Sequence, residues 1–246
     1  MSVARLAALI RERQPCVVLT GAGISTESGI PDFRSPGGLW SEFDPYDYAS
    51  IDSFRRDPAR SWAFYGPRLR FLADAEPNAG HRALAELERR GLVQALVTQN
   101  IDTLHERAGS RDVIEVHGSI RRAVCLRCGM QELLAQVLVQ LADGRPAPLC
   151  PACGEVLKPD VVMFGDLLPE RAIGRAAELA RRAGLLLVVG SSLEVFPVAG
   201  LPAETLEAGG ALAIVNRGPT PYDGRSTLLL DGGAGEILGE VVSELG

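Results

Sequence analysis

Continuous runs of apolar residues alternate along the chain with segments whose apolar residues recur at helical spacing. The apolar runs of strand length cover residues 16–20, 92–98, 185–189 and 211–215. The helical spacing covers residues 3–13, 79–90, 169–183, 201–208 and 235–244. Runs without polar alternation are typical of parallel strands that helices cover on both faces. The alternation therefore predicts an α/β protein with a doubly wound parallel sheet.

Two stretches interrupt this alternation. Residues 31–77 are rich in turn formers and aromatic residues, and they predict a loop followed by a helical excursion. Residues 121–158 contain two Cys-x-x-Cys pairs and predict a small separate unit. A chain of this length fits one domain that carries an inserted module.

The charge balance bears on the class of partner. The chain has 246 residues, of which 31 are acidic and 25 basic, so its formal net charge is −6. This balance disfavours nucleic acid or an anionic membrane as the main partner. No apolar stretch reaches the ~18 residues of a spanning helix, and charged residues break the N-terminal apolar run that a signal peptide would need. We therefore expect a cytoplasmic protein, and a monomer as the simplest assembly.

A glycine-containing loop follows the first predicted strand. Gly21, Ala22 and Gly23 come directly after residues 16–20, where glycines allow a phosphate to approach the backbone. A standard dinucleotide fingerprint would carry a third glycine, but Thr26 stands at that position. An ordinary hydride-transferring dehydrogenase is therefore disfavoured. A tight strand-to-helix turn without a ligand is the alternative.

Four of the five cysteines form two pairs, Cys125 with Cys128 and Cys150 with Cys153. The pairs are 21 residues apart, one beyond the usual spacing of a four-thiolate zinc site, and a glycine follows each pair. Four thiolates fill the tetrahedral coordination of zinc, so we expect a structural ion that cannot activate water. Two redox dithiols or disulfides are the competing interpretation. Cys16 lies in an apolar run and is expected to be a core residue.

The chain has three histidines. His81 and His105 lie in a predicted helix and a short helical turn, where structural roles are expected. His117 follows the strand-like residues 113–116, which places an imidazole at the predicted ligand edge of the sheet. Histidine titrates near neutrality and can take a proton from a sugar hydroxyl. From the residue alone, a structural role for His117 stays open.

Several polar motifs occur in a fixed order around the cysteine pairs. They are GAGISTESGIPDFRSPGGLW at 21–40, TQNIDTLHERAG at 98–109, HGS at 117–119, GSS at 190–192 and VN at 215–216. Together they resemble the sirtuin family of NAD-dependent protein-lysine deacylases, of bacterial or archaeal type. The resemblance covers essentially the whole chain.

The resemblance implies how the chain is divided and what it binds. Residues 1–34, 78–120 and 159–246 would form a Rossmann-like NAD-binding domain. Residues 35–77 would form the cofactor loop and a helical module, and residues 121–158 a zinc ribbon, which together make a smaller domain. NAD would lie between the two domains, and one structural zinc ion would hold the smaller one.

The resemblance also implies the binding residues. Those of the cofactor loop are Gly21, Ala22, Gly23, Thr26, Asp32, Phe33 and Arg34. Those of the nicotinamide pocket are Gln99, Asn100, Ile101 and Asp102. Those around the adenosine half are Gly190, Ser191, Ser192, Asn216 and Ala234. An aspartate and an asparagine suit a carboxamide, which has both donors and acceptors.

The implied reaction is group transfer from an acyl-lysine to ADP-ribose. The acyl oxygen attacks the ribose carbon that bears nicotinamide, and nicotinamide leaves. His117 would be the catalytic base that deprotonates a ribose hydroxyl, with Asn100 and Asp102 as the other catalytic residues. The products would be the free lysine, nicotinamide and O-acyl-ADP-ribose.

Two segments match those that sandwich the acyl-lysine peptide, residues 158–166 and 191–197. The substrate-binding residues implied there are Val161, Phe164, Gly165 and Val195. A peptide added as a strand is held by main-chain hydrogen bonds, so many sequences would be tolerated. We expect acyl-lysine proteins or peptides as substrates.

The acyl group is open at this stage. Tyr65 and Arg68 resemble the Tyr-x-x-Arg of the sirtuin branch that removes succinyl and malonyl groups, in which the arginine would pair with the acyl carboxylate. Ala49 aligns with a small residue that deepens that pocket. Alternatively, Tyr65 packs in the helical module and Arg68 is a solvated charge. Residues 32–34 match plain deacetylases, and Pro67 can redirect the helix.

Two other functions use the same NAD-binding features. One is mono-ADP-ribosyl transfer to a protein nucleophile. The other is a non-catalytic NAD or ADP-ribose sensor, which would be expected to lack His117 or Asn100. Both residues are present, so deacylation is favoured.

Overall fold

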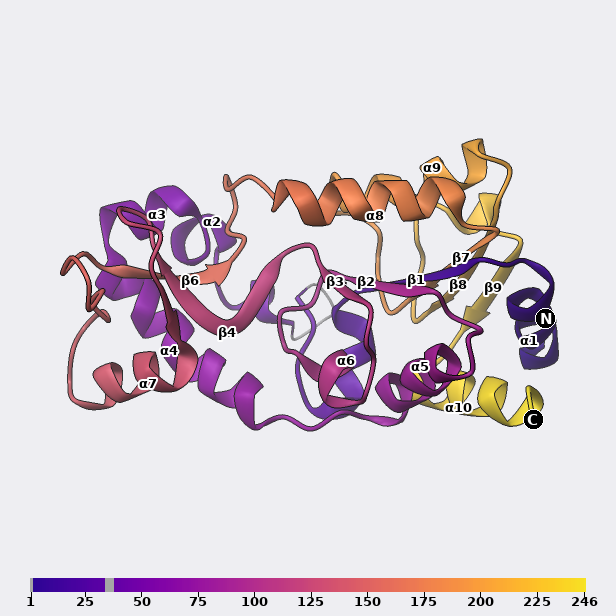
Figure 1. Cartoon of the computed structure of the whole chain (residues 1–246), viewed down its shortest axis with the longest axis horizontal. Helices are drawn as coiled ribbons and strands as arrows, with labels where there is room; N and C mark the ends of the chain where they lie inside the picture. The colour runs from indigo at the N-terminus through magenta and orange to yellow at the C-terminus, as the bar shows by residue number, and fades with distance from the viewer. Residues whose placement is uncertain (1, 34–37) are drawn as a thin grey trace.

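The computed structural model describes residues 2–33 and 38–246. Its larger sheet has six parallel strands in the order β3-β2-β1-β7-β8-β9 (Figure 1). Their bounds are β1 Cys16–Thr20, β2 Ala95–Thr98, β3 Val113–Glu115, β7 Leu185–Val189, β8 Ala211–Asn216 and β9 Leu228–Asp231. The strand order reverses between β1 and β7, and ligands bind at such switch points in open α/β sheets. The predicted doubly wound fold is confirmed.

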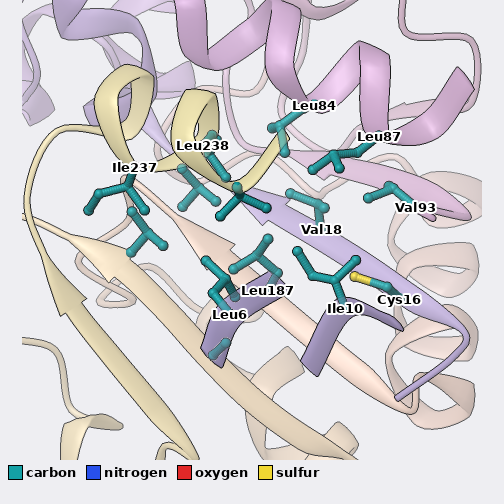
Figure 2. Packing of buried hydrophobic residues seen from close by; sticks show 14 of the residues in the cluster. Leu6, Ile10, Cys16, Val18, Leu84, Leu87, Val93, Leu187, Ile237 and Leu238 are labelled. Atoms are coloured by element: carbon teal, nitrogen blue, oxygen red, sulfur yellow. The ribbon is translucent and has the colours of Figure 1, made fainter. Parts of the chain in front are cut away.

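Helices cover both faces of this sheet (Figure 1). On one face lie α1 (Val3–Glu12), α5 (Ala79–Arg89) and α10 (Ala234–Glu244). On the other lie α8 (Glu170–Arg182) and α9 (Leu201–Glu207). Figure 2 shows the first face, where Leu6 of α1, Leu84 of α5 and Leu238 of α10 converge on Val18. Cys16 lies in the same cluster, and burial raises the pKa of its thiol to about 12, so it is a core residue as expected.

A second, antiparallel sheet lies toward the other end of the molecule (Figure 1). Its strands, in the order β5-β4-β6, are β4 Gly118–Cys125, β5 Gln131–Leu133 and β6 Leu157–Val161. The helices of this part are α2 Pro45–Tyr48, α3 Ile51–Arg56, α4 Pro58–Asp74 and α7 Leu134–Ala142. Trp62 of α4 is buried here, and its indole N–H donates to the carbonyl oxygen of Leu157 at 2.7 Å. The helical excursion predicted for 31–77 is thus tied to β6.

The structure adds detail that the hydrophobic pattern did not predict. The strand expected over 92–98 begins only at Ala95. Pro67 lies inside α4, and the helix continues through it to Asp74. β9 and the second sheet were not predicted from the pattern. The remaining short helices are α6 Leu104–Arg107, η1 Ala22–Ser28, η2 Leu39–Ser41, η3 Val198–Gly200 and η4 Asp223–Arg225. Among the described residues, none of the helices has the length and hydropathy needed to cross a bilayer.

Candidate functional site

The loops after β1 and β7 touch at the point where the strand order reverses. The N–H of Gly23 donates to the carbonyl oxygen of Gly190 at 2.9 Å. A Cβ atom on Gly21 or Gly23 would lie 2.8 Å from that same oxygen. Both glycines are therefore required for packing between the two loops. This is a different reason from the approach to phosphate that the sequence suggested for them, although both stay at the ligand edge of the sheet.

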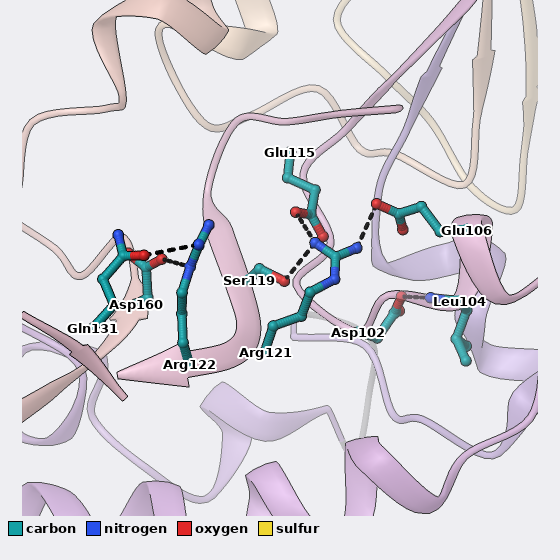
Figure 3. Close-up of polar contacts among 9 residues, drawn as sticks. All are labelled: Asp102, Leu104, Glu106, Glu115, Ser119, Arg121, Arg122, Gln131 and Asp160. Carbon is teal, nitrogen blue, oxygen red and sulfur yellow. Dashed lines mark hydrogen bonds and ion pairs between the residues drawn. The ribbon is translucent and has the colours of Figure 1, made fainter. Parts of the chain in front are cut away.

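Ser25, in η1, joins two of the predicted nicotinamide-pocket residues. Its hydroxyl donates to Asp102 Oδ2 at 2.7 Å and accepts a hydrogen from Asn100 Nδ2 at 3.1 Å. The Asn100 amide also donates to the carbonyl oxygen of Gly21 at 3.1 Å. Asp102 further accepts the N–H of Leu104 (Figure 3). Burial raises the pKa of Asp102 above its ordinary value despite these hydrogen bonds. The sequence reasoning did not assign Ser25, although its place in the glycine loop was a signal.

Two histidines are buried directly beneath this cluster. The rings of His81 and His105 meet edge to face, with centroids 4.9 Å apart. His81 Nε2 lies 3.4 Å from the hydroxyl of Ser25, and His105 Nε2 lies 2.9 Å from that of Thr20. Burial lowers the pKa of His81 to about 4 and lowers that of His105 as well. Both rings are therefore neutral at physiological pH, and they support the site through their contacts with Ser25 and Thr20.

The third histidine, His117, lies between β3 and β4. Its Nδ1 lies 3.0 Å from the carbonyl oxygen of Gln99. Because a carbonyl oxygen only accepts hydrogen bonds, Nδ1 carries the hydrogen and Nε2 is left as an acceptor. Burial lowers the pKa of His117, and the Gln99 carbonyl partly opposes this shift. The Gln99 side chain donates to the hydroxyl of Ser191 at 2.9 Å, which links the ends of β2 and β7.

Arg121 contacts residues on both sides of His117 in the sequence, and Figure 3 shows its contacts with Glu106, Glu115 and Ser119. Its guanidinium contacts Glu115 Oε2 at 2.7 Å and Glu106 Oε1 at 2.5 Å. It also donates to the hydroxyl of Ser119 at 3.2 Å. Glu115 precedes the turn that carries His117 and Ser119 follows it, so the guanidinium spans the turn and ties it to α6.

The cysteine pairs meet in one cluster. The four Sγ atoms lie within 4.8 Å of one another. Two of the Sγ–Sγ contacts, at 3.5 Å and 3.6 Å, join a cysteine of one pair to a cysteine of the other. Four thiolates at zinc–sulfur bond lengths would be about 3.8 Å apart, so the cluster fits a tetrahedral zinc ion. Gly129 and Gly154 have φ values of +74° and +76° and make the two matching turns. Cys125, Cys128, Cys150 and Cys153 are thus positioned to bind a structural zinc, as predicted.

The other predicted NAD-binding residues are spread along the same edge. The Asn216 amide donates to the carbonyl oxygens of Arg217 and Gly218, and Ala234 begins α10. Ser192 donates to Glu194. Thr26 turns back and donates to the carbonyl oxygen of Gly23. Through these hydrogen bonds, the side chains of Asn216 and Thr26 stabilise the loops in which they lie.

The cofactor loop is described only in part. The ring of Phe33 is 39% exposed and stacks on Trp40 with centroids 5.4 Å apart. The carbonyl oxygen of Asp32 accepts the N–H of Leu39 at 3.0 Å. Ile101 accepts the N–H of Ile120 through its carbonyl oxygen. Arg34 lies outside the described residues.

Tyr65 and Arg68 lie on α4. Tyr65 is buried, which raises the pKa of its hydroxyl, and the charges of Asp166 and Arg68 both act on it. The Arg68 guanidinium lies 3.8 Å from the ring centroid of Phe64 and 4.6 Å from that of Phe43. It donates to the carbonyl oxygen of Phe64 at 2.7 Å. Arg68 is therefore a half-buried, stacked cation and not a solvated one.

The segment 158–166 lies next to this helical module. Phe164 donates its N–H to the carbonyl oxygen of Ala49 and accepts that of Ile51, at 2.8 Å and 3.0 Å. Ala49 and Val161 are buried, and Gly165 is exposed. Val195, in the second predicted peptide-binding segment, is half-buried. No contact joins Val195 to residues 158–166 among the hydrogen bonds of the described residues.

The donor set at the sheet edge suits NAD. An amide and a carboxylate lie together at Asn100 and Asp102, and hydroxyl and amide groups follow at the ends of β7 and β8. A carboxamide needs both acceptors and donors, and ribose hydroxyls need the same mixture. The site thus presents the hydrogen-bonding groups that both ends of a dinucleotide require.

Comparisons with known proteins place this chain in one family. The model of the Sir2 family matches residues 21–197. An NAD-dependent protein deacetylase of Caldivirga maquilingensis is 46% identical over 241 residues, which cover 98% of this chain and 93% of that protein. An NAD-dependent protein deacylase of Pyrococcus furiosus is 41% identical, with 96% of this chain and 95% of that protein covered.

Solved structures of Sir2 proteins are also similar to this chain over nearly its whole length. A complex of Sir2 with a p53 peptide and NAD⁺ has a TM-score of 0.91 at 40% identity, covering 99% of this chain and 98% of that one. A Sir2 protein bound to a propionylated peptide has the same TM-score, identity and coverage.

Proposed function

Because this chain belongs to the Sir2 family, we propose that the ends of β1, β2, β7 and β8 bind NAD and that His117 acts there as the base. The protein is an NAD-dependent protein deacylase. NAD supplies the ADP-ribosyl group that accepts the acyl group from lysine. The proposal concerns which residues of this chain hold the two substrates and move the proton.

The observation that carries this proposal is the hydrogen bond between His117 and Gln99. It leaves Nε2 of His117 as an acceptor that can take a proton from a ribose hydroxyl. The lowered pKa keeps the ring neutral, which is the form that a base needs. Gln99 also binds Ser191 at the end of β7, on the far side of β1, so the imidazole is oriented by a residue that is itself tied to the proposed NAD edge.

Asn100 and Asp102 are proposed to hold the nicotinamide carboxamide. The hydroxyl of Ser25 sets the position of both side chains, because it contacts each of them. The adenosine half is assigned to Ser191, Ser192 and Asn216, at the ends of β7 and β8. These positions follow the order of the sheet from the switch point outward.

The experiment mixes the protein with NAD and an acetyl-lysine peptide. Release of nicotinamide together with O-acetyl-ADP-ribose, and their loss in His117→Ala, is the expected outcome. Nicotinamide release with label transferred to protein would support mono-ADP-ribosyl transfer instead. Binding of NAD without any release would indicate a sensor.

The zinc ion is proposed to hold the smaller part of the molecule together. Four cysteine ligands leave zinc no open position for water or substrate. The ion would join the turn after β4 to the turn before β6, and β6 leads into the segment proposed to bind the peptide. The two sheets have separate hydrophobic clusters, which supports a Rossmann-like domain beside a smaller one. The cluster of the smaller sheet includes Ile120, Val161 and Met163, so it extends into the ranges 1–34, 78–120 and 159–246 that we assign to the Rossmann-like domain.

We also propose that the acyl site accepts a carboxylate-bearing group such as succinyl. Tyr65 is a buried residue, and within the described residues its hydroxyl has no hydrogen-bond partner. The Arg68 guanidinium is held nearby by two aromatic rings and uses only one nitrogen for the Phe64 carbonyl. A free hydroxyl beside a cation that keeps unused donors is suited to a carboxylate.

The test compares succinyl-lysine and acetyl-lysine peptides. Arg68→Met should lower kcat/KM for the succinyl peptide by at least about tenfold and leave that for the acetyl peptide nearly unchanged. Arg70→Met is the matched control, because Arg70 is exposed on the same helix. Unchanged succinyl turnover in Arg68→Met would show that the arginine does not bind the acyl group.

A further inference from the structure

Lys158 is a buried cation on β6 that the reaction described above does not use. Only 5% of the residue is exposed. Its ammonium lies 2.9 Å from Asp166 Oδ2 and donates to the carbonyl oxygen of Val161 at 2.7 Å. A buried charge is tolerated only when its partners are close and well oriented. The Lys158 ammonium therefore connects the end of β6, at Val161, with Asp166 five residues further along the chain.

Asp166, the partner of Lys158, also fixes a turn. The same Oδ2 atom accepts the N–H of Met163 at 3.0 Å, and the N–H of Asp166 donates to the carbonyl oxygen of Met163 at 2.9 Å. Gly165 lies inside this turn with φ of +85°, a conformation that favours glycine. The ion pair thus closes residues 158–166 into a loop with a defined turn at its end.

This loop is bonded to the site on two sides. The N–H of Val162 donates to the carbonyl oxygen of His117 at 2.9 Å. Phe164 pairs through its backbone with Ala49 and Ile51 of the helical module. The N–H and C=O of Gly165, by contrast, have no hydrogen-bond partner among the described residues. The loop is therefore held at its sides while backbone groups at its turn stay open to a ligand.

We propose that the Lys158–Asp166 ion pair is a positioning element that holds residues 161–165 in the conformation to which the acyl-lysine peptide binds. The inference rests on the proposed function, in which these residues contact the peptide. Neither side chain is proposed to touch the reacting atoms. The pair acts through the backbone of the segment that it closes.

A second ion pair on the same strand provides the control. Asp160 lies two residues from Lys158 and contacts the guanidinium of Arg122 at 3.0 Å (Figure 3). The Arg122 side chain is 43% exposed, and exposed ion pairs contribute little to stability. Arg122→Gln thus removes this ion pair from β6 without changing any residue of the segment 158–166 that Lys158 closes.

The test measures steady-state kinetics with an acetyl-lysine peptide and with NAD. Lys158→Met should raise KM for the peptide by about tenfold or more, while kcat and KM for NAD change by less than about twofold. Lys158→Arg keeps the charge and should restore most of the peptide affinity. Arg122→Gln should match the native protein in all three constants. A purely structural role would instead reduce the amount of folded protein and leave the peptide KM of the folded fraction unchanged.

Several outcomes would overturn the proposal. One is native peptide KM in folded Lys158→Met, and another is an equal loss in Lys158→Met and Arg122→Gln. If Lys158→Met does not fold, Asp166→Asn is measured in the same way, since Asp166 is less buried and asparagine can still accept the Met163 N–H. Failure of both variants to fold would make the pair a folding element and reject the positioning role. If the native protein itself releases no nicotinamide, the proposed function fails. If the native protein turns over normally and Lys158→Met does so as well, only the positioning role fails.

Discussion

The Nδ1 atom of His117 donates its hydrogen to the carbonyl oxygen of Gln99 across 3.0 Å, and this one contact fixes which ring nitrogen can accept a proton. Gln99 follows β2 and His117 follows β3, so the contact depends on the pairing of two neighbouring parallel strands. The orientation of the His117 ring thus depends on the pairing of β2 with β3. A change at Gln99 that alters the backbone would misplace the imidazole without touching it.

The pH dependence of catalysis follows from the lowered pKa of His117. The base works in its neutral form, and burial moves its pKa below the ordinary 6.5. The acid limb of kcat/KM is therefore expected to have its midpoint below pH 6.5, and His117→Ala should lower kcat by about 10²-fold or more. A pH profile with an acetyl-lysine peptide measures this. A midpoint above pH 6.5 would contradict the burial of the free base.

The buried histidine pair makes stability depend on pH in the acid range. The pKa of His81 falls from 6.5 in the unfolded chain to about 4 in the folded protein, chiefly because of burial. Above pH 6.5 both states are neutral and the free energy of unfolding is unaffected. As pH falls from 6.5 toward 4, the unfolded state binds the proton first, so stability is lost, by about 3 kcal/mol for His81.

Urea unfolding of the native protein and of His81→Asn across this range tests that expectation. The variant should show a shallower loss of stability on acidification, because it lacks one group that protonates only on unfolding. The comparison is a difference between two proteins with the same cysteines, so any loss of metal at low pH affects both. Parallel curves would show that His81 does not titrate in this way.

Much of the site could be predicted because its residues occur in short motifs with recognisable spacing. The cysteine spacing predicted the metal cluster, and the position of His117 after a strand-like run predicted that it lies at the ligand edge of the sheet. Ser25 and the Lys158–Asp166 pair could not be recognised in the same way. Ser25 and Asp102 are 77 residues apart and meet only through the sheet. A lone lysine in a strand gives no sign that folding will bury it.

The glycines show a second limit of pattern reading. Gly21 and Gly23 match a phosphate-binding loop, but the structure gives them a packing reason, the contact with Gly190. A glycine in a sequence pattern indicates that the position has no room for a side chain. The pattern does not indicate whether a ligand or another part of the protein occupies that space. Similarly, β9 contains a run of three leucines, which is too short to be distinguished from a helix end and has no β-branched residue to favour a strand.

Removal of zinc is expected to unfold the smaller part of the molecule. Cys128→Ser should lower the zinc content from one ion per chain to nearly none, because three thiolates bind zinc much more weakly than four. The melting temperature should fall and activity should be lost with it. Cys16→Ala is the control, since Cys16 lies in the core of the larger sheet and should leave the zinc content unchanged. Metal analysis and thermal unfolding measure both effects, and full zinc content in Cys128→Ser would reject the four-cysteine site.

Asp102→Asn separates NAD binding from peptide binding. The substitution keeps the size of the side chain and an oxygen that can accept the Ser25 hydroxyl, but it removes the charge and one acceptor. We expect kcat/KM for NAD to fall by about tenfold or more, with KM for the peptide nearly unchanged, because Asp102 lies on the nicotinamide side of the site. Asp112→Asn is the matched control, since Asp112 lies at the opposite end of a parallel strand, before β3, in an exposed pair with Arg175. Equal effects of the two substitutions on NAD kinetics, or a selective rise in peptide KM for Asp102→Asn, would place the carboxylate outside the nicotinamide pocket.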